Sequence, residues 1–237
     1  MLQTHSLLIA LATSLIPTTG HTKTAFSPDA RPALHETMNH QDRVFHQIHA
    51  APFGIGLDIA ITSPEVTAEV QAFALGTGTV EEETGKHPFS LVAGYSGPSG
   101  IGLRGGGAAF ATAFRYRALR QEGANAEILE QAREDVIRAI NTLHVVVAIT
   151  GEPGRVARGV QRLKPENPTS PPIPLADRRE PVPLFDTDGN PLPPEKNNGT
   201  PRADNSQGKL PAGEWSWEDS CSKDQLIGWV TAMGALY

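Results

Sequence analysis

The stretch NAEILEQAREDVIRAINTLHVVVAITGEPG, residues 125–154, has the strongest helical pattern in the chain and decides the expected fold class. Its apolar residues recur at three- and four-residue spacings, which is typical of a helix with one apolar face. The positions in this stripe are Ile128, Ala132, Val136, Ile140, Leu143 and Val147. Gly151 and Pro153 then supply a stop signal. A helix of this kind needs neighbouring helices against which it can bury the stripe.

The residues just before this stretch supply one neighbour. Residues 107–123, GAAFATAFRYRALRQEG, also show a helical pattern. The connection EGAN at residues 122–125 is so short that the two helices must form an antiparallel hairpin. We therefore expect residues 25–163 to be a region of antiparallel helical hairpins and the chain to be mainly α.

Two earlier helices are expected at residues 30–54 and 63–76. Pro32 and Pro64 stand at first-turn positions, where the fixed proline backbone suits a helix. Between these helices and residue 107 the sequence is rich in glycine, which we interpret as a loop after a strand-like segment, FSLVAGY.

This glycine-rich passage contains a formal match to the dinucleotide fingerprint, at Gly100, Gly102 and Gly105. A dinucleotide-binding unit needs a second strand after the helix that follows the glycines, and here another helix follows. No cofactor is therefore expected.

Composition limits the partners of the protein. The 237 residues include 20 basic and 26 acidic side chains, and the formal charge of −6 argues against nucleic-acid binding, which needs a basic surface. The single cysteine, Cys221, excludes an internal disulfide and a cysteine-rich zinc site. The oligomeric state is left open.

The first 24 residues resemble a signal peptide or leader. Residues 7–16 are largely apolar and Pro17 follows them, whereas a membrane span needs about 20 apolar residues. We expect an exported protein, periplasmic or extracellular, without a stable membrane anchor. The alternatives are an N-terminal core helix or a disordered leader.

Residues 164–214 form a proline-rich excursion, expected to be a long loop, with 12 of the 20 prolines of the chain. Asp188 and Gly189 predict a small β-hairpin within it. Residues 215–237 are expected to lead into a further helix, in which Ser222 and Gln225 form a capping box. Because no stop signal follows, we expect a fragment of a longer protein.

Two tryptophans and two carboxylates crowd the expected start of this helix. Trp215 and Trp217 could stack on sugar rings, while Asp219 and Asp224 could act as acid and base on a glycosidic bond. Under this hypothesis Arg158 and Lys223 are their charge partners and help to bind a polysaccharide or oligosaccharide. In the alternative, the acids only complement the helix dipole and the indoles anchor the loop.

The first expected helix carries a second group of candidate residues. His35, Asp42, His46 and His49 fall within a narrow arc at helical spacing, and such side chains are potential zinc ligands. A helix alone rarely completes a coordination sphere, and His87 is the remote candidate. The alternative is that these residues only flank the apolar stripe.

Three segments together resemble a known type of protein: FATAFRYRALRQEGA, AREDVIRAINTLHVVVAITGEPGRVARG and WEDSCSKDQLIGWVTAMGALY. Their order is similar to that in exported bacterial proteins that look like α/α toroids of the six-hairpin glycosidase type. The matching motifs are a turn with Thr150, Gly151, Pro153, Gly154, Ala157 and Arg158, and a helix start with Ser222, Lys223, Asp224, Gln225 and Gly228. The resemblance covers residues 85–237 and implies the N-terminal part of a toroid.

Three functions follow from these observations, and whether the chain is an enzyme is left open. The leading hypothesis is glycan binding or cleavage, by a hydrolase or lyase, at the mouth of the toroid. The second is a non-catalytic structural or interaction protein. The third is a metal-dependent hydrolase that uses the histidines of the first helix.

Overall fold

The computed structural model describes residues 31–176, 179–194 and 199–237. The expected leader, residues 1–24, lies outside these ranges. The chain divides into two compact units, residues 1–38 and residues 39–237. Within the described ranges, no helix is both long enough and apolar enough to cross a membrane.

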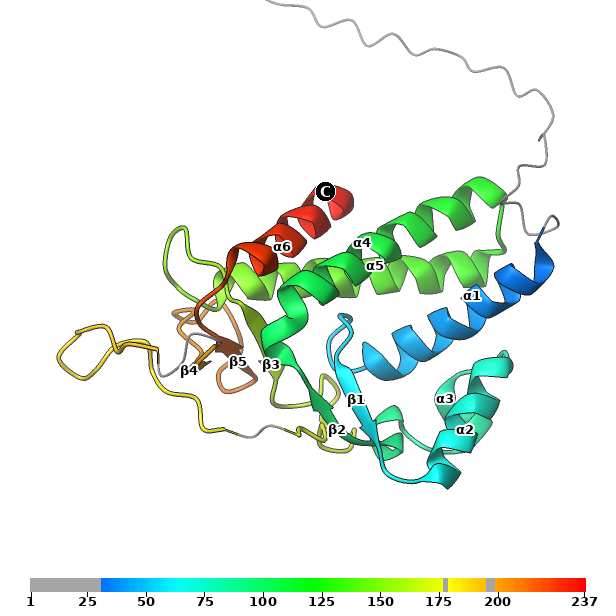
Figure 1. Cartoon of the computed structure of the whole chain (residues 1–237), viewed down its shortest axis with the longest axis horizontal. Helices are drawn as coiled ribbons and strands as arrows, with labels where there is room; N and C mark the ends of the chain where they lie inside the picture. The colour runs from blue at the N-terminus through cyan, green and yellow to red at the C-terminus, as the bar shows by residue number, and fades with distance from the viewer. Residues whose placement is uncertain (1–30, 177–178, 195–198) are drawn as a thin grey trace, which may run out of the picture. The chain divides into compact units, whose positions relative to one another are not determined.

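The structure confirms that the chain is mainly helical. Three long helices dominate the second unit: α4 (Ile101–Glu122), α5 (Ala126–Ala148) and α6 (Lys223–Leu236). Helices α4 and α5 form the predicted antiparallel hairpin, and α6 lies beside α4 and runs in the same direction (Figure 1). The side chain of Asn125 caps α5 by accepting a hydrogen bond of 2.9 Å from the backbone N–H of Ile128.

The interpretation of the glycine-rich passage as a loop is wrong, because α4 begins at Ile101 and includes these glycines. The glycines are needed where α4 meets α6. A Cβ atom on Gly106 would overlap the backbone of Gly228, and one on Gly228 would overlap the carbonyl of Gly102. Glycine therefore lets the two helix backbones touch, and this gain in packing outweighs its low helix propensity.

The buried face of α5 is rotated relative to the predicted stripe. Ile128 and Val147 are 43% and 48% exposed, whereas Asp135 and Thr142 are buried. The full buried set on α5 is Ala132, Asp135, Ala139, Thr142, Leu143, Val145 and Val146. Ala132 and Leu143 of the predicted stripe are buried, but small and polar residues occupy several other positions that face the neighbouring elements.

A smaller lobe precedes the long helices. Helix α1 (Pro32–Val44) continues into a π-helix (Phe45–His49), and β1 (Asp58–Ile61) pairs antiparallel with β2 (Val92–Ser96). Between the two strands lie α2 (Pro64–Leu75), capped by Ser63, α3 (Val80–Thr84) and a 3₁₀-helix (Pro88–Leu91). A 3₁₀ turn (Pro98–Gly100) then leads into α4.

The hydroxyl group of Tyr95, on β2, joins this strand pair to the π-helix. It donates a hydrogen bond of 2.9 Å to the backbone carbonyl of Ile48, and burial raises the pKa of the Tyr95 phenol far above its ordinary value. The contact fixes the position of the π-helix against the strands.

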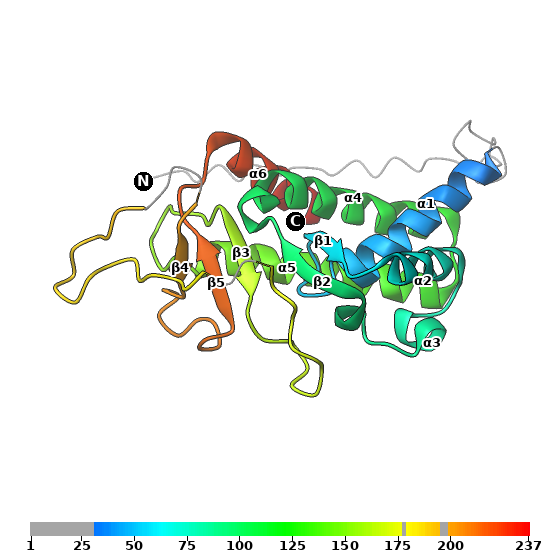
Figure 2. The ribbon, with the colours of Figure 1, turned by 60° about the horizontal axis from the view of Figure 1, so that its bottom comes forward.

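A three-stranded antiparallel sheet is formed by residues that were expected to be helical or to belong to the long loop. Strand β5 (Trp215–Glu218) lies between β3 (Gly159–Arg162) and β4 (Pro201–Ala203), as Figure 2 shows. All four residues of β5 are buried, so the strand has no alternation of polar and apolar residues by which a sequence pattern could be recognised. The sheet joins both ends of the proline-rich excursion to the helices.

The small hairpin predicted inside the excursion is confirmed. Phe185 and Pro191 form an antiparallel bridge. The Asp186 carboxylate accepts hydrogen bonds of 2.9 Å and 2.8 Å from the backbone N–H groups of Asp188 and Asn190. Hydrogen bonding from Asn190 lowers the pKa of Asp186, as expected for a carboxylate that stabilises a turn.

The contact between α4 and α6 generates a matched pair of glycine variants. Gly106→Ala places a methyl group against the backbone of Gly228, whereas Gly107→Ala, one residue later, meets nothing within 4 Å. We expect Gly106→Ala to lower the free energy of unfolding by about 1–3 kcal/mol. We expect Gly107→Ala to raise it by about 0.5–1 kcal/mol, because alanine favours the helix.

Urea unfolding followed by circular dichroism measures both variants. Equal stabilities for the two proteins would contradict the backbone contact between the helices.

Candidate functional site

The tryptophans expected at the mouth are core residues. Trp215 and Trp217 are 7% and 1% exposed. The Trp215 ring packs edge-on against Phe53 at 5.6 Å, with the guanidinium of Arg162 over it at 5.2 Å. The indole N–H of Trp217 donates a 2.9 Å hydrogen bond to the carbonyl of Ala203. The prediction that these indoles are open stacking platforms is wrong, since their faces are covered by protein.

The two carboxylates of the expected mouth have separate partners. Asp219 pairs with Arg202, whose side chain is fully buried, at 3.1 Å. Asp224 is exposed at the first turn of α6, and a hydrogen bond from the Ser222 hydroxyl lowers its pKa. A general acid needs a raised pKa, so Asp224 is unsuited to that role. Lys223 is exposed beside it.

Arg158 has a structural role in place of the expected ligand-binding role. Its guanidinium donates hydrogen bonds to the carbonyl of Ser99 at 2.8 Å, the carbonyl of Ser220 at 3.2 Å and the hydroxyl of Ser222 at 3.1 Å. Ser222 is at the N-cap of α6 as predicted, but its side chain makes no capping bond. The other half of the predicted capping box, Gln225, accepts a hydrogen bond of 2.9 Å from the backbone N–H of Leu103.

The predicted histidine face of the first helix is broken by the π-helix. Its wider turn, closed by a hydrogen bond of 2.8 Å from the Ala50 N–H to the Phe45 carbonyl, changes the angle between successive side chains. His49 contacts the carbonyl of Leu57 at 2.9 Å and lines a different cavity from His46. His35 belongs to the first unit of the chain.

Asp42 and His46 form a compact charged cluster with two residues from other helices. The Nε2 atom of His46 lies 3.3 Å from Asp42, and its Nδ1 atom lies 3.6 Å from Asp135 on α5. Arg115, from α4, bridges both carboxylates at 2.5 Å and 3.3 Å. The exposed fraction of the Asp135 side chain is 3% and that of His46 is 10%. We call these four residues the His46 cluster.

The His46 cluster lies in the wall of a cavity of about 380 Å³. Other residues around the cavity offer amide, hydroxyl and guanidinium groups: Arg43, Gln47, Gln131, Arg138, Asn167 and Ser170. Such a wall places hydrogen-bond donors and acceptors, together with side chains of both charge signs, around a small volume. The cavity therefore suits a compact polar ligand.

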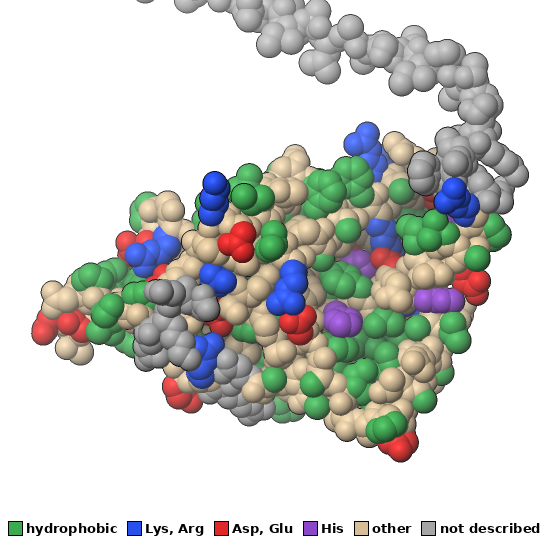
Figure 3. Space-filling view, viewed as in Figure 1, with side chains coloured by type: hydrophobic (Ala, Val, Ile, Leu, Met, Phe, Trp, Pro, Cys, Tyr) green, Lys and Arg blue, Asp and Glu red, His purple; other side chains and the backbone are tan. Residues whose placement is uncertain are grey.

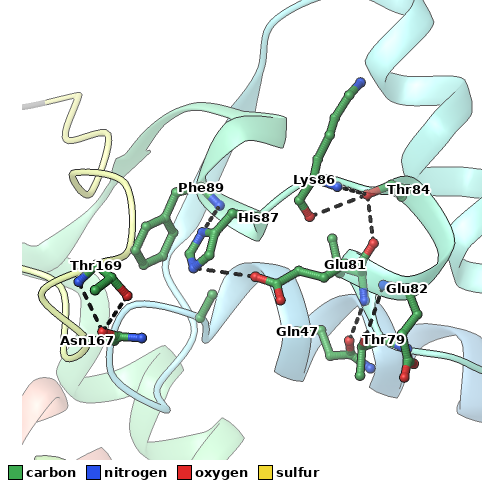
Figure 4. A network of polar contacts seen from close by, with 12 residues as sticks. Gln47, Thr79, Glu81, Glu82, Thr84, Lys86, His87, Phe89, Asn167 and Thr169 are labelled. Atoms are coloured by element: carbon green, nitrogen blue, oxygen red, sulfur yellow. Dashed lines mark hydrogen bonds and ion pairs between the residues drawn. The ribbon is translucent and has the colours of Figure 1, made fainter.

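The rim of this cavity is held by local polar contacts, drawn in Figure 4. His87, Phe89 and Asn167 lie close together there, and the backbone N–H of Phe89 donates to His87 Nδ1 at 3.2 Å. Asn167 accepts a 3.0 Å hydrogen bond from the N–H of Thr169. Gln47 accepts from the N–H of Val80 at 2.9 Å. The expected remote residue His87 thus shares a cavity with His46.

The described residues contain no group of three or more histidine, cysteine, aspartate or glutamate side chains arranged to hold a metal ion. Of the expected ligands, Asp42 and His46 lie together with Arg115 and Asp135, whereas His49 lines another cavity and His87 lies 3.9 Å from Glu81. A guanidinium placed against both carboxylates competes directly with a cation for their oxygens. The groups of the cluster are therefore suited to proton transfer and hydrogen bonding.

Sequence reasoning missed Asp135 and Arg115. The available signal was a carboxylate on the buried side of α5, where an unpaired charge would be costly and a partner is therefore required. Its partner is on the preceding helix, 20 residues away, and no local pattern connects the two. The pair becomes visible when the hairpin brings both helices together.

The two aspartates of the expected mouth should differ sharply in their effect on stability. Asp219→Asn leaves the fully buried Arg202 without its anion, so we expect the free energy of unfolding to fall by about 3 kcal/mol. Asp224→Asn changes an exposed residue and should leave stability nearly unchanged. Chemical unfolding of both variants checks this. Equal effects would show that Asp219 is not a structural anion.

Comparison with protein-family models, with curated proteins and with solved structures gave no match.

Proposed function

We propose that the protein binds a polyhydroxylated ligand of the carbohydrate class in the polar cavity and that His46 transfers a proton during its cleavage. The observation that carries this proposal is the placement of His46 between Asp42 and Asp135, with Arg115 across both carboxylates. This refines the hypothesis of glycan binding or cleavage by moving the site from the start of α6 to the cavity.

The surroundings of His46 suit a general acid–base residue. Histidine changes charge near neutral pH, which allows it both to accept and to donate a proton. Carboxylates face both ring nitrogens of His46 and orient the imidazole. One of them, Asp42, is 25% exposed and could give way to a ligand, whereas Asp135 is enclosed and positions the ring.

The remaining groups of the cavity match the hydrogen-bonding properties of sugars. Each sugar hydroxyl is both a donor and an acceptor, so a wall of amides, carboxylates and guanidinium groups can satisfy several at once. The side-chain amides of Gln47, Gln131 and Asn167 each carry a hydrogen-bond donor and a hydrogen-bond acceptor. A volume of about 380 Å³ corresponds to the small end of typical ligand sites, about 300–1,000 Å³, and favours one or two sugar rings.

The expected toroid-type fold and the export of the protein are part of the same proposal. Parallel helices α4 and α6, with the antiparallel α5 against both, support the first hairpins of an α/α ring, where alternate helices run in the same direction. The proposed location outside the cytoplasm, periplasmic or extracellular, still depends on the apolar segment at residues 7–16.

His46→Gln tests the acid–base role. Release of reducing ends from a panel of neutral and acidic polysaccharides should fall by at least about 100-fold, since a proton-transfer group contributes about 10²–10⁴-fold. The matched control is Asp224→Asn, outside the cavity, which should retain full activity. Helical signal by circular dichroism should be the same in both variants.

Two results would contradict the proposal. Loss of activity in Asp224→Asn, with His46→Gln unaffected, would return the site to the start of α6. A wild-type chain that neither cleaves a polysaccharide of the panel nor is retained by it would instead favour a non-catalytic structural protein. In that case the His46 cluster would serve only to join α1, α4 and α5.

A further inference from the structure

A second, larger cavity lies between the C-terminal halves of α5 and α6, away from the His46 cluster. Its volume is about 880 Å³, and its wall is mainly apolar, with Leu143, Val147, Val156, Met233 and Tyr237. It shares no lining residue with the polar cavity. We call it the α5/α6 groove.

Much of the apolar wall of the α5/α6 groove faces solvent. Val147 is 48% and Tyr237 is 74% exposed. Further exposed apolar side chains, Leu226 and Val230, continue the same stripe along α6, and Figure 3 shows hydrophobic side chains over the α4 and α6 region of the surface. Covering such surface is favourable by about 25 cal/mol per Å².

The wall of the groove is built by contacts between its two helices. The hydroxyl of Tyr237, near the end of α6, contacts the Nε2 atom of the exposed His144 on α5. His144 is exposed on the surface of α5. Its contact with Tyr237 keeps the last turn of α6 over α5.

One end of the groove carries an excess of positive charge. Arg155 and Lys209 both line it, together with a single carboxylate, Glu152. Among the residues that the structure describes, neither cation makes an ion pair. Two cations against one carboxylate leave this end able to accept an anion.

The charged end is held in place by backbone contacts. Asn205 donates from its side chain to the carbonyl of Thr150 at 2.7 Å and from its backbone to the carbonyl of Ile149 at 3.0 Å. Gly151 has φ +65° and lies so close to Asn205 that a side chain would overlap it. The turn that bears Arg155 is therefore fixed to the loop that bears Lys209.

We propose that the α5/α6 groove binds a free long-chain carboxylate. The hydrocarbon chain would cover the apolar wall, while the carboxylate would lie between Arg155 and Lys209. Both side chains can donate charge-assisted hydrogen bonds to it, which are stronger than hydrogen bonds between neutral groups. Sites for small ligands are typically apolar cavities of about 300–1,000 Å³ with a few polar groups at defined places, as here. This inference is independent of the function proposed for the polar cavity.

Displacement of the fluorescent anion 1-anilinonaphthalene-8-sulfonate from the full chain tests the groove. Dodecanoate, below its micelle concentration, should displace the probe saturably, whereas butyrate, with the same head group and little apolar surface, should not. The double variant Arg155→Gln/Lys209→Gln should bind dodecanoate about 10-fold more weakly. Val147→Asp should abolish binding by placing a carboxylate in the apolar wall.

Arg133→Gln is the matched control, because Arg133 is an exposed arginine of α5 outside the groove. This variant should bind dodecanoate like the wild-type chain. Equal affinity for dodecanol and dodecanoate would overturn the role of the two cations. Absence of saturable displacement would overturn the site. A dimer that Val147→Asp converts to a monomer would also overturn the site, because a second copy of the chain would then cover the groove.

Discussion

The direct backbone contact between α4 and α6 is the constraint on which the rest of the second unit depends. It is possible only because Gly102, Gly106 and Gly228 have no side chains. With the two helices so close, the indole N–H of Trp229 reaches the carbonyl of Ala157 at 3.0 Å. Arg158, the next residue, joins the start of α6 to the turn before α4. The three-stranded sheet is thereby attached to the helices.

The hairpin formed by α4 and α5 creates the polar cavity. Arg115 on α4 and Asp135 on α5 meet because the two helices are antiparallel neighbours, and α1 contributes the second carboxylate through Asp42. A buried carboxylate is tolerated only with such partners, so the charge pair and the helix packing support each other. The polar cavity and the α5/α6 groove are both consequences of how α5 packs against its neighbours, and they offer opposite chemistry.

Local signals in the sequence predicted local structure well. The stop after α5 and the start of α6 after Ser222 depend on nearby residues and are found as expected. The glycine-rich start of α4, strand β5 and the Arg115–Asp135 pair depend on contacts between distant segments. For these, tertiary packing outweighs local preference, so a glycine-rich stretch becomes helix and a tryptophan-rich stretch becomes a buried strand.

The π-helix at Phe45–His49 makes the position of His46 depend on the number of residues in this helical segment. A π turn contains one residue more than an α-helical turn. This extra residue rotates the side chains that follow it around the helix axis. Removal of a single residue upstream of His46 would let the segment revert to α geometry and swing the imidazole by about 100° around the helix axis. Spacing along the backbone, as much as side-chain identity, therefore determines where this imidazole points.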